Sequence, residues 1–173
     1  MEEKNHIGRL DIITIGNDTL RQKAKDIIHI DDKIRRIAEG MVQVMHAAPG
    51  IGLAAPQVNH SIRLITVDLS AGRNSDDLMI LLNPEITHRE GRDLMEEGCL
   101  SVPGINEKLI RPYEVVCRGT DLKGREKTIE AEGLLARVLC HEIDHLNGIL
   151  FIDHLSPLKK KLIKKKITPV HKS

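Results

Sequence analysis

The feature that most constrains this chain is the stretch His141-Glu142-Ile143-Asp144-His145, which lies inside a helix predicted over residues 133–148. Leucine, valine and isoleucine recur at helical spacing through this run, and Gly148 stands where a left-handed C-terminal cap is expected. A helix that is apolar on most sides is buried, so its histidines point into protein. Two histidines four residues apart lie on one helix face, where they can bind a single metal ion.

Glu142 lies one position further round this helix, where it can reach a water at the metal without becoming a ligand. This arrangement is typical of metal-assisted hydrolysis, in which the metal acidifies a water and the glutamate carries its proton. The competing interpretation is a core helix whose two histidines bind backbone carbonyls.

A third ligand has to come from elsewhere in the chain. The longer peptidase pattern H-E-x-x-H-x-x-G-x-x-H fails because Phe151 stands in place of its last histidine, and no glutamate follows Glu142. Asp153 and His154 are downstream candidates. Cys99, upstream, is the better choice, because Cys, His and His make a three-ligand site with one open position.

Hydrophobic periodicity predicts a mixed fold. Strands are expected at 10–15, 62–69 and 79–82 and as a hairpin at 115–119 and 127–131, with helices at 20–24, from Asp31 or Asp32 to 48, at 133–148 and near the C-terminus. With one Tyr, one Phe and no Trp among 173 residues, the core must be aliphatic. No repeat or linker divides the chain. We expect a single domain, residues 1–173, of the α+β class, with antiparallel strands packed around the histidine helix and a C-terminal helix.

Composition indicates the setting of the protein. No apolar run reaches the roughly 18 residues of a membrane span, the N-terminus does not resemble a signal peptide, and three widely spaced cysteines suit a reducing compartment. We therefore expect a cytoplasmic monomer without membrane contact.

Residues 156–173 carry seven Lys and no acid, so this segment is the candidate contact for an anionic partner. The alternative is a helix docked by its apolar face with its lysines in water.

Two further segments carry unusual residues. Residues 50–57 read Gly-Ile-Gly-Leu-Ala-Ala-Pro-Gln, where the glycines suit close approach of another backbone and the Lys-Ser/Thr ending of a phosphate loop is missing. Residues 96–104 place Cys99 behind a glycine and ahead of a Pro-Gly turn, which predicts an irregular segment.

Together, residues 50–57, residues 97–101 (Glu-Gly-Cys-Leu-Ser) and residues 141–145 resemble the three motifs of the peptide deformylase family, in the family's order. The likeness runs from about residue 10 to residue 166. It implies an enzyme that removes the formyl group from the N-terminal methionine of newly synthesised polypeptides and releases formate. The roles it implies are metal ligands for Cys99, His141 and His145, general base and then acid for Glu142, and oxyanion donors for the Gln57 side chain and the Leu100 backbone N–H.

The resemblance also implies a substrate-binding set, which comprises Ile51, Gly52, Glu97, Gly98, Leu134, Arg137 and Val138. Ile51 and Gly52 are expected to flank an extended substrate on one side and Gly98 on the other, as in strand addition. The methionine side chain is expected against the helix, with the head of Arg137 reaching the rim of its pocket. Glu97 is expected to pair with Arg111.

Metal and partners follow from the same likeness. Ligand chemistry alone favours zinc, whereas the resemblance implies Fe(II) in the cell, with Zn(II), Ni(II) or Co(II) able to substitute. The partners implied are N-formylmethionyl nascent peptides and the ribosome near its exit tunnel, contacted by the basic C-terminal helix. An H-E-x-x-H metallopeptidase and a metal-stabilised binding protein without catalysis are the alternative interpretations.

Overall fold

The computed structural model describes residues 10–167. Its helices are α1 (Asp32–Ala47), α2 (Gly133–Leu146) and α3 (Pro157–Ile167), with short 3-10 turns η1 (Asp18–Arg21), η2 (Ala55–Val58), η3 (Ser75–Asp77) and η4 (Phe151–His154). Its strands are β1 (Gly52–Ala54), β2 (Leu64–Val67), β3 (Met79–Glu90), β4 (Asp93–Cys99), β5 (Val102–Arg111), β6 (Glu114–Thr120) and β7 (Glu126–Glu132). Every pairing between these strands is antiparallel, in two sheets of order β1-β2-β3-β6-β7 and β4-β5.

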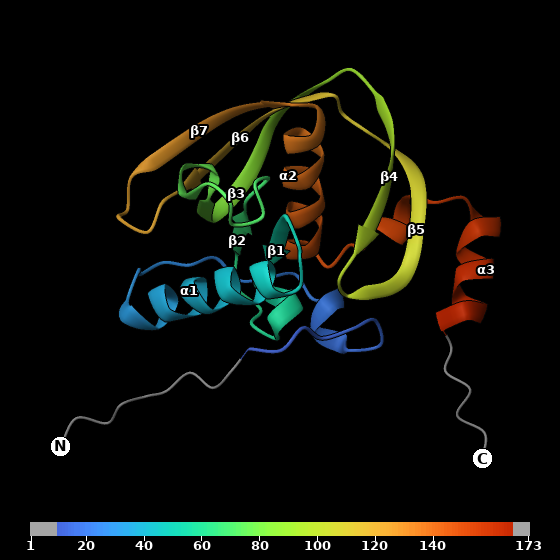
Figure 1. The fold of residues 1–173 in the computed structure, drawn as a ribbon, viewed down its shortest axis with the longest axis horizontal. Coiled ribbons are helices and arrows are strands. Elements are labelled where there is room, and N and C mark those ends of the chain that lie inside the picture. Colours follow the sequence, from blue (N-terminus) through green and yellow to red (C-terminus); the bar gives the residue numbers. More distant parts are fainter. Residues whose placement is uncertain (1–9, 168–173) are drawn as a thin grey trace, which may run out of the picture.

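Helix α2 stands between the two sheets, with α1 under the larger sheet and α3 beyond β5 (Figure 1). The predicted α+β class and the central position of the histidine helix are therefore confirmed. Gly148 has the left-handed conformation expected past the end of α2, with φ +72°. No helix within residues 10–167 is long and apolar enough to cross a bilayer.

Strand β2 of the larger sheet is buried on both faces. Ile65 and Val67 of β2 pack with Leu139 of α2, whereas Leu64 packs with Met41 of α1. Successive strand residues point to opposite faces, so a strand covered on both sides is largely apolar along its length, and Thr66 is the one polar residue of β2. This double covering fixes β1 and β2, which lie beside the histidine-bearing face of α2.

The third apolar cluster joins the smaller sheet to the C-terminal elements. Leu109 of β5, Phe151 of η4 and Ile163 of α3 belong to it. Helix α3 forms where predicted, but Leu158 and Leu162 are 69% and 51% exposed. The predicted apolar face of this helix is thus only partly docked, and residues 168–173 lie outside the described part of the chain.

Several predicted elements differ from the structure. The strand predicted at 10–15 is wrong, because Ile13 donates its N–H to the Gln57 carbonyl and Ile15 donates to the Ser101 carbonyl, so this segment bridges two elements instead of joining a ladder. The helix predicted at 20–24 is the single turn η1. Strand β3 extends beyond its predicted end to Glu90, and β4 and β5 lie outside the predicted strands.

Candidate metal centre and cavity

Three ligand atoms converge between α2 and the end of β4. Nε2 of His145 lies 3.3 Å from Sγ of Cys99 and 3.2 Å from Nε2 of His141. Such separations suit one ion bound at about 2.0 Å to nitrogen and about 2.3 Å to sulfur. Within residues 10–167 this is the only group of three Cys, His or acidic side chains so arranged.

The elements explain this convergence. His141 and His145 occupy successive turns of α2, and Cys99 is the last residue of β4, beside a register shift between Gly98 and Cys99. Cys99 therefore ends a strand, which corrects the expected irregular segment. The downstream alternatives do not join the group, because Asp153 pairs with Arg21 and His154 contacts Asp144.

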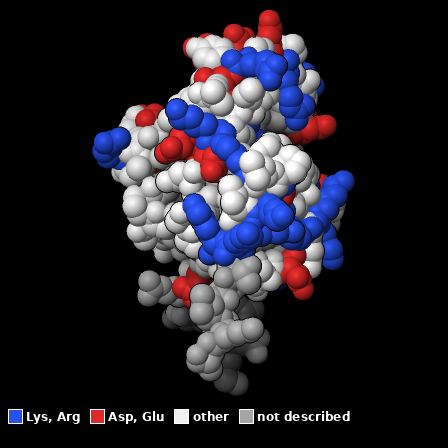
Figure 2. Space-filling model, turned by 90° about the vertical axis from the view of Figure 1, so that its right-hand side faces the viewer, with Lys and Arg blue, Asp and Glu red and all other residues white. Residues whose placement is uncertain are grey.

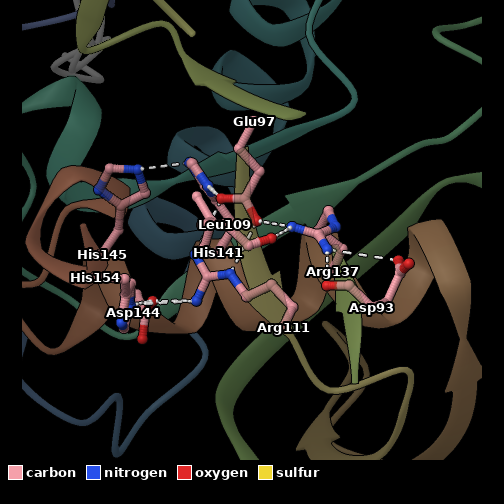
Figure 3. Close-up of polar contacts among 9 residues, drawn as sticks. All are labelled: Asp93, Glu97, Leu109, Arg111, Arg137, His141, Asp144, His145 and His154. Carbon is pink, nitrogen blue, oxygen red and sulfur yellow. Dashed lines mark hydrogen bonds and ion pairs between the residues drawn. The ribbon is translucent and has the colours of Figure 1, made fainter. Parts of the chain in front are cut away.

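Glu97 holds His141 from behind. Its Oε2 lies 2.9 Å from Nδ1 of His141, and its Oε1 accepts hydrogen bonds from Nε of Arg111 at 2.9 Å and Nη1 of Arg137 at 2.8 Å (Figure 3). Burial alone would raise the pKa of Glu97, but hydrogen bonds from His141 and Arg111 hold this pKa well below its usual range. The ionised carboxylate orients the imidazole, so that Nε2 of His141 faces the other ligands.

Arg137 corrects a prediction. Its side chain is 3% exposed, and its Nη2 donates to the backbone carbonyl of Asp93 at 2.7 Å while Nη1 binds Glu97 and the carbonyl of Leu109. The head is therefore buried behind the cavity and not at its rim. No local pattern indicates that Glu97, in a strand distant along the chain, pairs with it. The expected pairing of Glu97 with Arg111 is confirmed.

Burial sets the electrostatics of the site. It raises the pKa of Glu142 to about 7 in the absence of an ion's charge. For His141, burial lowers the pKa, but hydrogen bonds to Cys99 and Glu97 outweigh it and raise the value to about 10. Burial and the charge of His141 lower the pKa of His145 well below its usual value. A carboxyl with a pKa near neutrality can both take and release a proton.

Gly52 makes room for Glu142. A Cβ at Gly52 would lie 2.8 Å from Cγ1 of Val138 and would overlap the carboxylate of Glu142.

Oε2 of Glu142 and Nδ1 of His145 are buried and have no hydrogen-bond partner among residues 10–167. Buried polar atoms without partners are costly and mark a place for a ligand or water. The donor set and the unpaired Oε2 of Glu142 fit a metal ion and its water, whereas Nδ1 of His145 lies across the ring from the Nε2 that faces the other ligands.

Gln57 is oriented toward the same centre. Its Oε1 accepts a hydrogen bond from the backbone N–H of Ala54 at 2.9 Å, which fixes the amide. Its Nε2 consequently donates to Oγ of Ser101 at 3.2 Å and lies 3.5 Å from Sγ of Cys99. Leu100 occupies the turn directly after Cys99.

A cavity of about 170 Å³ opens onto these residues. Its lining comprises Ile51, Gly52, Gln57, Glu96, Glu97, Gly98, Cys99, Leu100, Leu134, Arg137, Val138, His141 and Glu142. The predicted metal ligands, catalytic residues and substrate-binding residues all line this cavity except His145, which is buried. Sequence reasoning missed Glu96, which lines the cavity, and Ser101, which holds the Gln57 amide.

A Cys-His-His centre with two buried histidines, beside a glutamate and a cavity, is typical of metal-dependent hydrolases. The family model for polypeptide deformylase matches residues 9–161. The chain is 49% identical to a peptide deformylase of Thermodesulfovibrio yellowstonii, covering 91% of this chain and 95% of the relative. It is also 49% identical to one of Halothermothrix orenii, covering 89% and 98%.

Solved structures agree with this assignment. The Legionella pneumophila peptide deformylase superposes with a TM-score of 0.86 at 39% identity, covering 91% of this chain and 92% of that one. The enzyme of Synechococcus elongatus in complex with actinonin gives 0.86 at 41% identity, covering 93% and 89%. The chain belongs to the polypeptide deformylase family. It is a metal-dependent hydrolase that removes the formyl group from the N-terminal methionine of newly synthesised polypeptides and releases formate.

Proposed function

We propose that Cys99, His141 and His145 bind the working metal and that Glu142 is the proton carrier of the reaction. The observation that carries this proposal is the unpartnered, buried Oε2 of Glu142 beside three converging ligand atoms. A metal held there would supply Lewis-acid chemistry, which lowers the pKa of a water and polarises a carbonyl.

Each nearby residue then has a defined task. Glu142 takes the proton of the attacking water and delivers it to the leaving amine. The Nε2–H of Gln57 and the backbone N–H of Leu100 donate to the developing oxyanion, each such donor being worth about 3 kcal/mol of barrier. Glu97 acts through His141, whose orientation it fixes.

The cavity supports the proposed substrate path. An extended formyl-methionyl peptide lies with its backbone between Ile51 and Gly52 on one side and Gly98 on the other. Its methionine side chain packs against Leu134 and Val138 of α2, which line the cavity. Arg137 contributes only its stem to this wall, since both terminal nitrogens bind β4 or β5.

The metal and the partners are further parts of the proposal. Fe(II) is the ion in the cell, and Zn(II), Ni(II) or Co(II) can replace it. The enzyme works as a cytoplasmic monomer. Helix α3 carries six lysines and lies on the side of the molecule where Lys and Arg gather (Figure 2), which supports contact between this helix and ribosomal RNA.

Formate release tests the catalytic assignment. Anaerobic protein loaded with Fe(II) should release formate from a formyl-Met tripeptide, and Glu142→Ala should retain the metal and lose at least about 10²-fold in turnover. Cleavage of internal amide bonds without need for a formyl group would favour the metallopeptidase interpretation. Full activity of Glu142→Ala would exclude the role proposed for Glu142.

Ribosome co-sedimentation tests the role of α3. Lys161→Gln with Lys165→Gln should weaken an association that decreases as salt rises. Lys123→Gln with Lys127→Gln, an equal charge change on the β6–β7 hairpin, should leave it unchanged. An association insensitive to salt and to the α3 changes would contradict the proposal.

A further inference from the structure

Asp68, which follows β2, fastens both ends of the connector between α1 and β1. Its Oδ2 lies 2.7 Å from Nε2 of His46, in the last turn of α1. Its backbone N–H donates to the carbonyl of Ile51 at 2.9 Å. Ile51 lines the cavity. The connector that carries one wall of the cavity is thus held at its start and at its end by the same residue.

The carboxylate of Asp68 has little freedom to move. Its side chain is 1% exposed. One oxygen accepts hydrogen bonds from the backbone N–H and the Oγ of Ser70, at 2.9 and 2.6 Å, while the other accepts from the backbone N–H of Gly72 at 2.8 Å. The oxygen that binds Gly72 is the one that faces His46, so the loop fixes the direction of the contact.

The loop also encloses the His46 ring. Gly72 has φ +85°, and a Cβ there would lie 3.3 Å from Nδ1 of His46. A larger residue would therefore be strained and would press on the ring. His46 is held between Asp68 and this glycine.

Strand β1 depends on such support. It has three residues and stands at the end of its sheet, so only β2 pairs with it among the described strands. We propose that Asp68 and His46 are positioning residues that hold Ile51 and Gly52 where the backbone of the formyl-methionyl peptide binds. This inference rests on the proposed use of Ile51 and Gly52 as the substrate-binding wall. Neither Asp68 nor His46 lines the cavity, so their effect passes through the connector.

Steady-state kinetics of the metal-loaded enzyme test this inference. His46→Leu removes the donor and keeps apolar bulk on α1. KM for a formyl-Met tripeptide should rise about threefold to tenfold, which corresponds to the loss of one hydrogen bond, with kcat changed less than about twofold. His46→Gln places an amide donor near the position of Nε2 and should restore KM.

Ser70→Ala is the matched control, because the Ser70 hydroxyl binds Oδ1 of Asp68 and not Oδ2, the oxygen that faces His46 and is still held by Gly72. It should lower the midpoint of thermal unfolding and leave KM unchanged. An unchanged KM in His46→Leu, or an equal rise in Ser70→Ala, would overturn the positioning role. Ile51→Ala distinguishes a failure of the positioning role from a failure of the proposed substrate-binding wall. If Ile51→Ala raises KM and His46→Leu does not, only the positioning role fails. If neither changes KM, the proposed wall fails with it.

Discussion

Glu97 contacts the metal-ligand candidate His141 through Oε2 to Nδ1, at 2.9 Å, while its other oxygen binds two arginines. The carboxylate therefore links the histidine on α2 to the smaller sheet. Partners of this kind set the tautomer and direction of a metal-binding imidazole.

Replacing this carboxylate should weaken metal binding. Glu97→Gln leaves Arg111 and Arg137 facing a neutral amide and should lower metal affinity about 10- to 100-fold. Competition with a chelator measures the change. Glu96→Gln, at the exposed neighbouring position in the same cavity, is the control and should bind metal normally. Equal affinities for both variants would contradict the role of Glu97.

Gly52→Ala should disable the enzyme without unfolding it. The added Cβ would displace Glu142 and Val138, and a displacement of about 1 Å at a reacting group can cost about 10²-fold in rate. We expect kcat/KM to fall by about that factor. Gly40→Ala, in α1 and remote from the cavity, meets only the flexible side chain of Leu10 and should keep normal kinetics. Normal turnover by Gly52→Ala would show that Glu142 tolerates the shift.

Gln57→Leu should reduce turnover far more than substrate binding. Its amide is proposed to donate to the oxyanion, and losing one such donor typically lowers kcat by about 10²- to 10³-fold. Ser101→Ala removes one hydrogen-bond partner of the amide and keeps the donor, so a much smaller effect is expected. Initial rates over a range of substrate concentrations separate kcat from KM. A change confined to KM would exclude the oxyanion role.

The buried carboxylate of Asp68 is expected to make the free energy of unfolding sensitive to acid. Hydrogen bonds from Ser70, followed by those from Gly72 and His46, hold the pKa of this buried carboxyl below its usual value despite the opposing effect of burial. In the unfolded chain the Asp68 carboxyl has a pKa near 3.9, so on acidification it is protonated there before it is protonated in the folded protein. The contribution of the ionised carboxylate to the free energy of unfolding is therefore complete above about pH 4. It disappears as pH falls through the lower folded pKa.

Urea titrations between pH 7 and pH 2 test this expectation. The free energy of unfolding of the native protein should fall more steeply below about pH 4 than that of Asp68→Asn, which should already be less stable at pH 7. Parallel curves would show that the native pKa of Asp68 is not depressed.

Metal removal should leave a folded protein. The apolar cluster between α2 and the larger sheet contains none of the three candidate ligands, and α1 packs on the opposite face of that sheet. After chelation, the far-UV circular dichroism should keep its shape, and thermal unfolding should stay cooperative at a lower midpoint. Loss of the cooperative transition would favour the interpretation in which the metal is required for folding.

Local patterns predicted α2 and the motif residues but not their surroundings. Helix α2 could be predicted because its apolar residues repeat at helical spacing before Gly148, and local periodicity reports burial. Strands β4 and β5 escaped prediction because Gly98, Pro103 and Gly104 interrupt them and charged residues occupy much of their length. These strands are stabilised by pairing with each other, which a local sequence pattern does not encode.

The buried position of Arg137 could not be predicted for a different reason. Its partners Asp93, Glu97 and Leu109 lie on strands that meet α2 only in the folded chain. The segment at residues 10–15 shows the converse. Its apolar residues read as a strand, yet its N–H groups bind Gln57 and Ser101 on two separate elements. Local sequence does not specify which distant carbonyl a backbone group will meet.

The candidate ligands belong to two different parts of the fold. Two histidines lie on a helix packed against the larger sheet, and the cysteine lies at the end of a strand of the smaller sheet. An unfolded chain offers an ion at most the local histidine pair, because Cys99 reaches it only after long-range docking. High-affinity capture of a metal by these three residues is therefore expected late in folding, and its rate would report when the smaller sheet closes onto α2.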